Sequence, residues 1–204
     1  MPAGTEARLP LAAAILAAGE SRRMGSPKAL LPYRGKNFTE YLLEVASHPR
    51  VGVRRVVLGA RAEEVRAQIH LGDAEVVINE EWQRGQLSSI QAAVRSLPAK
   101  QTAGLLLCPV DHPLVSAELV ARLIEEFDAS GKPIVLPTYR GKRGHPLIFA
   151  ASLYAEILDA SPEVGARQVV WAHAGDVLEV ATDEEGVVLN LNDPETLRRA
   201  MEAK

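Results

Sequence analysis

Cysteine, aromatic residues and long hydrophobic runs are all scarce in this sequence. A single cysteine, Cys108, occurs among 204 residues, so no disulfide forms within the chain and nothing requires an oxidising compartment. No apolar run is long enough to span a bilayer. The apolar stretch LPLAAAILAAG follows Glu6 and Arg8, so it lacks the basic leader of a signal peptide. We therefore expect a cytoplasmic protein without a membrane partner.

An excess of positive charge is also missing. Lysine and arginine number 23 against 26 aspartates and glutamates, which leaves a net charge of −3. This balance argues against a chain-wide surface for nucleic acid. The most basic stretch, YRGKRGHP at residues 139–146, offers only Tyr139 as an aromatic ring to stack on bases. We predict no nucleic-acid partner.

What the sequence does contain is an ordinary globular composition, with 47% hydrophobic and 24% charged residues. A length of 204 residues suits one large domain. We expect residues 1–10 to form a flexible leader and residues 11–204 to fold as a single domain.

Apolar runs alternate with amphipathic stretches along the chain. Strands are predicted at residues 11–18, 54–60, 74–79, 103–110, 133–138 and 145–151. Helices are predicted at residues 37–48, 62–70, 85–97, 116–127, 152–160, 164–173 and 193–204. Such alternation predicts an α/β fold with a mostly parallel sheet covered by helices on both faces. Residues 176–182 and 186–192 flank DEEG and are predicted to form a hairpin, which makes the sheet mixed late in the chain.

The loop after the first predicted strand reads LAAGESRRMGSPK, residues 16–28. Its small residues let a ligand approach the backbone, and Arg22, Arg23 and Lys28 supply fixed positive charge. Ligands of open α/β sheets bind at the carboxyl ends of the strands, where this loop lies. The segment matches neither GxGxxG nor a Walker A motif, which disfavours a dinucleotide oxidoreductase or a P-loop ATPase. A polyphosphate site is favoured over a solvated surface turn.

A second informative stretch is PVDHPLV, residues 109–115. Asp111 follows a buried strand and points toward the same edge of the sheet as the cationic loop. Mg²⁺ is commonly held by one or two carboxylates together with substrate phosphates, so Asp111 is a candidate ligand. The alternative is that Asp111 only begins a turn, as Asp often does.

Together these stretches resemble the MobA-like nucleotidyltransferases. Residues 16–28 resemble the family signature L-A-A-G-x-S-x-R-M-G-x-x-K, PVDHPLV resembles a D-x-P metal motif, RGHPLIF an R-G-H-P segment, and NLNDPETL a C-terminal motif. The resemblance covers residues 11–200 and implies a three-layer Rossmann-like fold, with a mostly parallel sheet and a late antiparallel portion. The R-G-H-P segment, and LAAG rather than LAGG, indicate the branch of molybdenum cofactor cytidylyltransferases.

The resemblance also implies roles for individual residues. The catalytic residues would be Arg23, Lys28 and Asp111. The nucleotide-binding residues would be Leu16, Ala17, Ala18, Gly19, Ser21, Arg23, Met24, Gly25, Lys28, Asn79, Gly85 and Ser89. The acceptor-binding residues would be Gln86, Ser88, Arg143 and His145. Asp111 and Asn192 would hold Mg²⁺, although the sequence leaves Asp193 open as the second contact because relatives differ at residues 190–193.

The implied reaction moves CMP from CTP onto the terminal phosphate of molybdopterin and releases pyrophosphate. Several alternatives stay open at this point. They are guanylyl transfer to the same cofactor, nucleotidyl transfer to a sugar phosphate or another phosphorylated small molecule, and a non-catalytic protein that delivers the cofactor. Transient contact with a molybdoenzyme is a further expectation.

Overall fold

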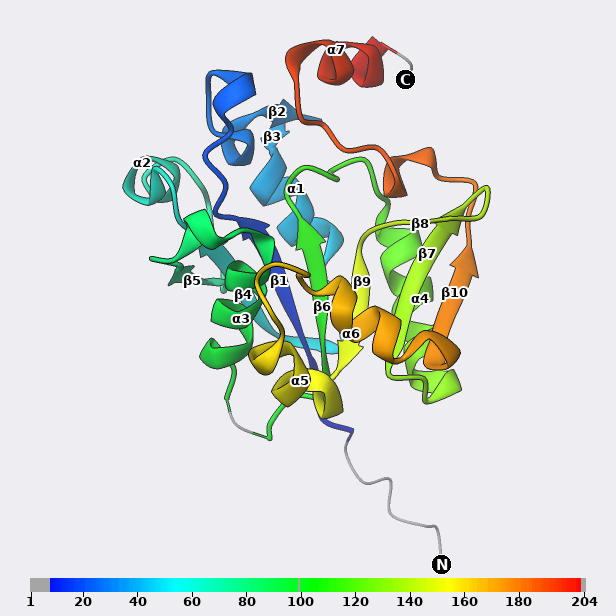
Figure 1. Cartoon of the computed structure of the whole chain (residues 1–204). Helices are drawn as coiled ribbons and strands as arrows, with labels where there is room; N and C mark the ends of the chain where they lie inside the picture. The colour runs from blue at the N-terminus through cyan, green and yellow to red at the C-terminus, as the bar shows by residue number, and fades with distance from the viewer. Residues whose placement is uncertain (1–7, 99, 203–204) are drawn as a thin grey trace, which may run out of the picture.

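The computed structural model describes residues 8–98 and 100–202 and is built around a twisted central sheet (Figure 1). The sheet has eight strands in the order β10-β7-β9-β6-β1-β4-β5, with β8 paired to β7. Their bounds are β1 Leu11–Ala17, β4 Val51–Leu58, β5 Glu75–Ile78, β6 Gly104–Pro109, β7 Ile134–Tyr139, β8 Lys142–Arg143, β9 Leu147–Ala150 and β10 Val177–Ala181. A separate two-stranded ribbon joins β2 (Pro32–Tyr33) to β3 (Lys36–Asn37).

Strand directions confirm a mostly parallel sheet with an antiparallel portion late in the chain. β1 runs parallel to β4 and β6, β4 runs parallel to β5, and β7 runs parallel to β10. β9 lies between β6 and β7 and runs antiparallel to both. All the parallel strands therefore end at one edge of the sheet, where loops from distant parts of the sequence meet.

Helices cover both faces, which makes three layers. They are α1 (Phe38–Val45), α2 (Ala62–Arg66), α3 (Gln86–Ser96), α4 (Ala117–Ser130), α5 (Tyr154–Asp159), α6 (Arg167–Ala172) and α7 (Pro194–Glu202). The central strand β1 is buried throughout and serves both layers, because its side chains alternate between the two faces. Leu11, Ala13 and Ile15 pack in the core with α1 and α4, whereas Ala12, Ala14 and Leu16 pack in the core with α3, α5 and α6.

The helices on the α1–α4 face begin at residues that the sequence marks for that role. Asn37 accepts a hydrogen bond from the Glu40 backbone, and the Glu40 side chain accepts one from the Asn37 backbone, which forms a capping box. Ser116 accepts a hydrogen bond from the Leu119 N–H at the start of α4. These caps satisfy N–H groups that a helix start otherwise leaves unpaired.

The predicted hairpin at residues 176–192 is wrong. β10 instead adds a parallel edge strand to β7, and residues 186–192 form no strand. That segment crosses back over the carboxyl ends of the strands toward α7 (Figure 1). Val187 and Leu191 are fully buried there, and Leu191 N–H donates to the Asp111 carbonyl at 2.8 Å. The apolar side chains of residues 187 and 191 are therefore removed from water by burial beneath the loops, without pairing as a strand.

Several element bounds also differ from the expected ones. The helix expected at residues 62–70 stops at Arg66, and the helix expected at residues 164–173 begins only at Arg167. Residues 1–7 of the expected leader and residues 203–204 of the last expected helix lie outside the described residues. Within the described part, no helix combines the length and the apolar character needed to cross a membrane.

Candidate active site

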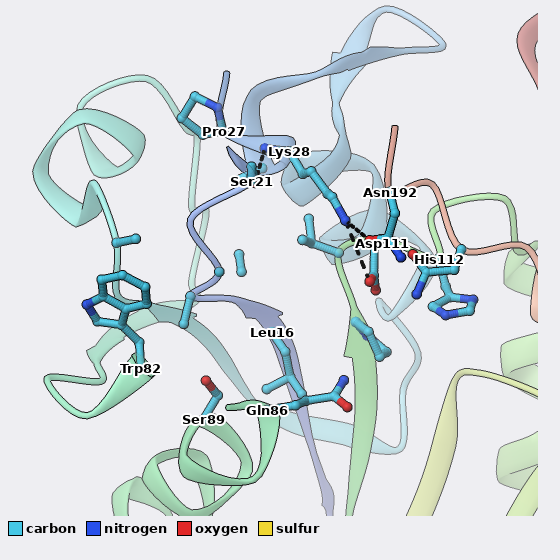
Figure 2. Close-up of a pocket in the computed structure, with 18 of the residues that line it drawn as sticks. Leu16, Ser21, Pro27, Lys28, Trp82, Gln86, Ser89, Asp111, His112 and Asn192 are labelled. Carbon is cyan, nitrogen blue, oxygen red and sulfur yellow. Dashed lines mark hydrogen bonds and ion pairs between the residues drawn. The ribbon is translucent and has the colours of Figure 1, made fainter. Parts of the chain in front are cut away.

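A polar cavity of about 450 Å³ opens at the carboxyl ends of the parallel strands. Loops after β1, β4, β5 and β6 line it, together with the C-terminal segment that crosses above them. This position is where open α/β sheets place their ligands. Figure 2 shows Lys28, Asp111 and Asn192 meeting on one side of the cavity and Trp82 on the other.

The loop after β1 is closed by its own side chains. The backbone N–H of Lys28 donates to Ser21 Oγ at 3.0 Å, and the Met24 N–H donates to the Ser21 carbonyl at 2.9 Å. Ser21 adopts the left-handed region with φ of 58°, and Gly25 does so with φ of 70°. The resulting tight loop turns Lys28 inward, where it is buried, and leaves Arg23 exposed at the rim.

The charged centre of the cavity joins Lys28 to two segments far away in the sequence. Lys28 Nζ lies 3.7 Å from Asp111 Oδ2 and donates a hydrogen bond to Asn192 Oδ1. Burial lowers the pKa of Lys28 from its usual value, while the neighbouring Asp111 carboxylate acts in the opposite direction. A buried cation that faces an acid and an open cavity is suited to binding an anion in place of water.

Asp111 is held in place from both sides. β6 ends at Pro109, and the next N–H, from Val110, donates to the Leu16 carbonyl at 3.1 Å. The Asp111 carbonyl accepts a hydrogen bond from the Leu191 N–H. The chain at residues 110–111 is therefore bonded both to β1 and to the C-terminal segment. The Asp111 side chain is 26% exposed and lines the cavity.

This donor set fits Mg²⁺ shared with a substrate. Among the described residues, no three or more His, Cys, Asp and Glu side chains gather as a metal cluster. One carboxylate from Asp111 and one amide oxygen from Asn192 are too few for a protein cage, but Mg²⁺ takes its remaining ligands from phosphates and water. Asp193 is used differently: its Oδ1 and Oδ2 accept bonds from Thr196 N–H and Oγ1 at the start of α7, at 2.9 Å each.

The loop after β5 is organised by a buried asparagine. Asn79 Nδ2 donates to Ser88 Oγ at 2.8 Å and to Ser89 Oγ at 3.0 Å, and its Oδ1 accepts from the Glu81 N–H. Gly85, which lies between Asn79 and Ser88 in the sequence, has φ of 94°, a backbone conformation that only glycine adopts readily. The arrangement brings the first turn of α3, including Gln86 and Ser89, to the cavity wall.

Most of the sequence-predicted residues line this cavity, and five do not. The lining residues are Leu16, Ala17, Ala18, Gly19, Ser21, Arg23, Lys28, Gly85, Gln86, Ser89, Asp111, His145 and Asn192. Met24, Gly25, Asn79, Ser88 and Arg143 do not line it. Asn79 and Ser88 are buried, and their side chains hold the loop after β5.

A second, apolar cavity of about 510 Å³ adjoins the polar one. The two cavities share Leu16, Gly85, Gln86, Pro109 and His145 as a common wall. Arg143 lines the apolar cavity, so the structure brings three of the four expected acceptor residues to it and leaves Ser88 outside.

His145 and His112 form a buried pair beside this common wall. Their ring centroids lie 4.9 Å apart, and both Nδ1 atoms are buried without a hydrogen-bond partner among the described residues. Burial lowers the pKa of His145 to about 4 and also lowers the pKa of His112. Both rings are therefore neutral near pH 7.

Two lining residues of the polar cavity were given no binding role from the sequence, Trp82, which was interpreted as a packing residue close to the site, and Ala60. Gly59 makes room for the tryptophan, because a Cβ at residue 59 would lie 2.6 Å from Trp82 Cβ and 2.9 Å from the Ala18 carbonyl oxygen. The sequence feature that indicates a close contact here is the glycine directly after an apolar strand, in LGA. The neighbouring residues do not show which distant segment makes that contact.

The chain is similar to a known protein family and to several of its members. The model of the MobA-like NTP transferase domain matches residues 13–177. Nicotine blue oxidoreductase of Paenarthrobacter nicotinovorans is 32% identical over 77% of this chain and 81% of that relative. A probable molybdenum cofactor guanylyltransferase of Mycobacterium avium is 31% identical over 95% of this chain and 96% of that relative.

Solved structures agree in fold. The Rv0371c protein of Mycobacterium tuberculosis superimposes with a TM-score of 0.82 at 27% identity, covering 95% of this chain and 98% of that one. The same protein has also been solved in complex with manganese, with a TM-score of 0.78 at 26% identity, covering 96% of this chain and 100% of that one. The match to residues 13–177, the Rossmann-like sheet and the loop after β1 lead to one conclusion: the chain belongs to the MobA-like NTP transferase family.

Proposed function

We propose that this protein transfers CMP from CTP to the terminal phosphate of a molybdopterin-type acceptor and releases pyrophosphate. The observation that carries the proposal is the meeting of Lys28, Asp111 and Asn192 in a cavity that opens directly onto a second one. Family membership supports nucleotidyl transfer, and the name of the Mycobacterium avium relative supports the acceptor.

The chemistry needs little from the protein beyond position and charge. An oxygen of the acceptor phosphate attacks the α-phosphorus, a new P–O bond forms, and the bond from the α-phosphorus to the departing pyrophosphate breaks. The attacking phosphate is already an anion near neutral pH, so no strong general base is required. Lys28 and Arg23 neutralise the charge that moves onto pyrophosphate, and Lys28 does so from a water-poor position.

Asp111 and Asn192 would hold Mg²⁺ together with the phosphates of the nucleotide. The ion would supply further positive charge to the same phosphates. Asn192 lines the polar cavity and Asp193 does not, which supports Asn192 as the second protein ligand. Asp193 instead accepts bonds from Thr196 at the start of α7. To hold the ion, Asn192 Oδ1 would give up the hydrogen bond that it accepts from Lys28 Nζ. The manganese complex of the Mycobacterium tuberculosis protein supports a divalent ion in this fold.

The nucleotide lies in the polar cavity with a defined direction. Its phosphates are drawn to the side with Lys28, Arg23 and Asp111. Its base extends over the small residues Ala17 and Ala18 toward Trp82 on the opposite side (Figure 2). The common wall then lies between the α-phosphate and the apolar cavity, which takes the acceptor. Gln86, His145 and Arg143 are placed there to contact it.

Cytosine as the base rests on the LAAG opening and the R-G-H-P segment. The test is pyrophosphate release with Mg²⁺ and isolated molybdenum cofactor, offering CTP, GTP and ATP separately. Asp111→Ala is the control, with circular dichroism to show that the variant is folded. We expect release with CTP that is lost in the variant.

Each other outcome is informative. Release with GTP alone would replace cytidylyl by guanylyl transfer. Undiminished release by Asp111→Ala would contradict the assigned metal ligand. No release with any nucleotide would contradict nucleotidyl transfer to this acceptor, and the oxidoreductase named among the relatives would direct the next assay.

A further inference from the structure

One wall of the apolar cavity carries residues that have no role in the proposed nucleotidyl transfer. It is built from α6 and the turn before it, and it presents Trp171 and Arg167. Trp171 is 62% exposed, although a large apolar ring is normally covered. The Arg167 guanidinium lies 5.8 Å from the centroid of the Trp171 ring, within the range of a cation–π contact.

Hydrogen bonds within residues 161–168 shape this wall, and the residues before it are bonded to α3. The Ser161 N–H donates to Gln168 Oε1 at 3.0 Å, and the Ser161 carbonyl accepts from Gly165 N–H at 2.9 Å. The chain before it is fixed to α3, because the buried Gln91 Nε2 donates to the carbonyls of Ile157 and Leu158 at 3.1 Å each. α3 also carries Gln86 in the wall common to both cavities.

The floor of the apolar cavity is aliphatic and aromatic, and charged residues stand among the rest of its lining. Leu107, Leu136, Leu147 and Phe149 are buried and form its floor. Arg84, Arg143 and Arg167 contribute three positive charges to its lining, against one acidic side chain, Glu163. Arg84 and Arg143 already pair with Glu81 and Glu179, which are outside the lining. The charges of the lining are therefore largely balanced, and the apolar floor beside an exposed indole suits a flat apolar ring.

We propose that Trp171 and Arg167 select the acceptor by stacking on a planar heteroaromatic ring system, while its phosphate is directed to the common wall. The site therefore takes a phosphorylated heterobicycle, such as a pterin, and discriminates against a sugar phosphate, which has no flat π face to stack. The proposal rests on the proposed function only for the direction of the phosphate. Stacking itself is a binding property that is measured without turnover.

The test is the affinity for neopterin monophosphate and for glucose 1-phosphate, measured by isothermal titration calorimetry on the full chain. We expect Trp171→Ala to weaken pterin binding roughly 10- to 100-fold, the range that loss of one aromatic stacking partner produces. Trp171→Phe keeps a π face and should retain most of the affinity. Ile78→Ala is the matched control, because Ile78 is another exposed large hydrophobic residue but lies outside both cavities.

Kinetics provide the second readout. With molybdenum cofactor as acceptor, Trp171→Ala should raise the KM for the acceptor and leave the KM for the nucleotide unchanged. Arg167→Gln should have a smaller effect of the same kind. Wild-type affinity for the pterin in Trp171→Ala, or equal affinity of the wild type for both probes, would overturn the inference even if turnover is normal. Pterin binding that depends on Trp171, without turnover on any nucleotide, would overturn the proposed function and leave this inference standing.

Discussion

The two adjoining cavities are similar in volume but differ in the side chains that line them. The polar cavity is formed by loops of small residues around a buried lysine and an acid, whereas the apolar cavity has a floor of leucine and phenylalanine with charge among its other lining residues. Fixed charges in a confined site stabilise the charge that develops in a transition state. An apolar floor with an aromatic wall selects ligands by their shape. Under the proposed function, the contrast assigns the reaction to one cavity and the choice of acceptor to the other, with Gln86 and His145 at the boundary.

The largest effect should come from removing the charge of the polar cavity. Lys28→Ala is expected to lower kcat by about 100- to 1000-fold, because the buried cation no longer stabilises charge on the departing pyrophosphate. The KM for the acceptor should stay within a few-fold of the wild type. Lys36→Ala is the matched control, since Lys36 pairs with Glu44 on the surface. Equal loss in both variants, or a change confined to the acceptor, would break the distinction between the cavities.

Acidification should weaken the fold through the wall that both cavities share. Burial lowers the pKa of His145 from 6.5 to about 4, so between these values the unfolded chain binds a proton that the folded chain excludes. Stability is therefore present above pH 6.5 and is lost as the pH falls toward 4, by at most about 3 kcal/mol from this residue. Urea unfolding at several pH values should show a shallower loss for His145→Gln than for the wild type. Parallel pH curves would contradict the buried, neutral imidazole.

Weakening the support of the apolar cavity should have an intermediate effect. Gln91→Ala removes donors to the carbonyls of Ile157 and Leu158 and is expected to cost about 2 kcal/mol in the free energy of unfolding. The KM for the acceptor should rise while the KM for the nucleotide does not. Gln68→Ala is the matched control, because Gln68 makes a comparable bond to the Glu64 carbonyl on an exposed helix end. Similar unfolding curves for the two variants would show that the buried bonds add nothing.

The smallest effect is expected at the far side of the polar cavity. A Cβ on Gly59 meets Trp82 at 2.6 Å, so Gly59→Ala should displace the indole and cost about 1–2 kcal/mol in stability. The KM for the nucleotide should rise a few-fold, with the acceptor unaffected. Gly175→Ala is the control, since a Cβ there meets nothing within 4 Å. An unchanged KM for the nucleotide would place the base away from Trp82.

Much of this arrangement is readable from the sequence because it depends on local pattern. The alternation of apolar runs and amphipathic stretches identified every strand of the sheet except the short β8. The small, cationic loop at residues 16–28 lies at the cavity as expected. The position of Asp111 after a buried strand also placed its side chain at that edge. Each of these signals lies within about ten residues, where periodicity and turn chemistry act directly.

Other features were decided by contacts between segments that are distant in the sequence. The apolar residues 186–192 resembled a strand, but they are buried by crossing over Asp111. Asn192 contacts Lys28, which lies 164 positions away in the sequence, whereas Asp193 contacts Thr196 at the start of α7. Trp171, Arg167 and Gln91 carry no local motif at all.

The sequence by itself therefore determined the fold class, the family and the charged side of the site, since local periodicity and a few short contiguous motifs encode them. The tertiary structure alone decided that an apolar cavity adjoins this site, which residues line it, and which amide faces Lys28. The physical reason is that a cavity exists only where packed elements leave space between them. That space depends on how whole helices and strands pack, which no local stretch of sequence specifies.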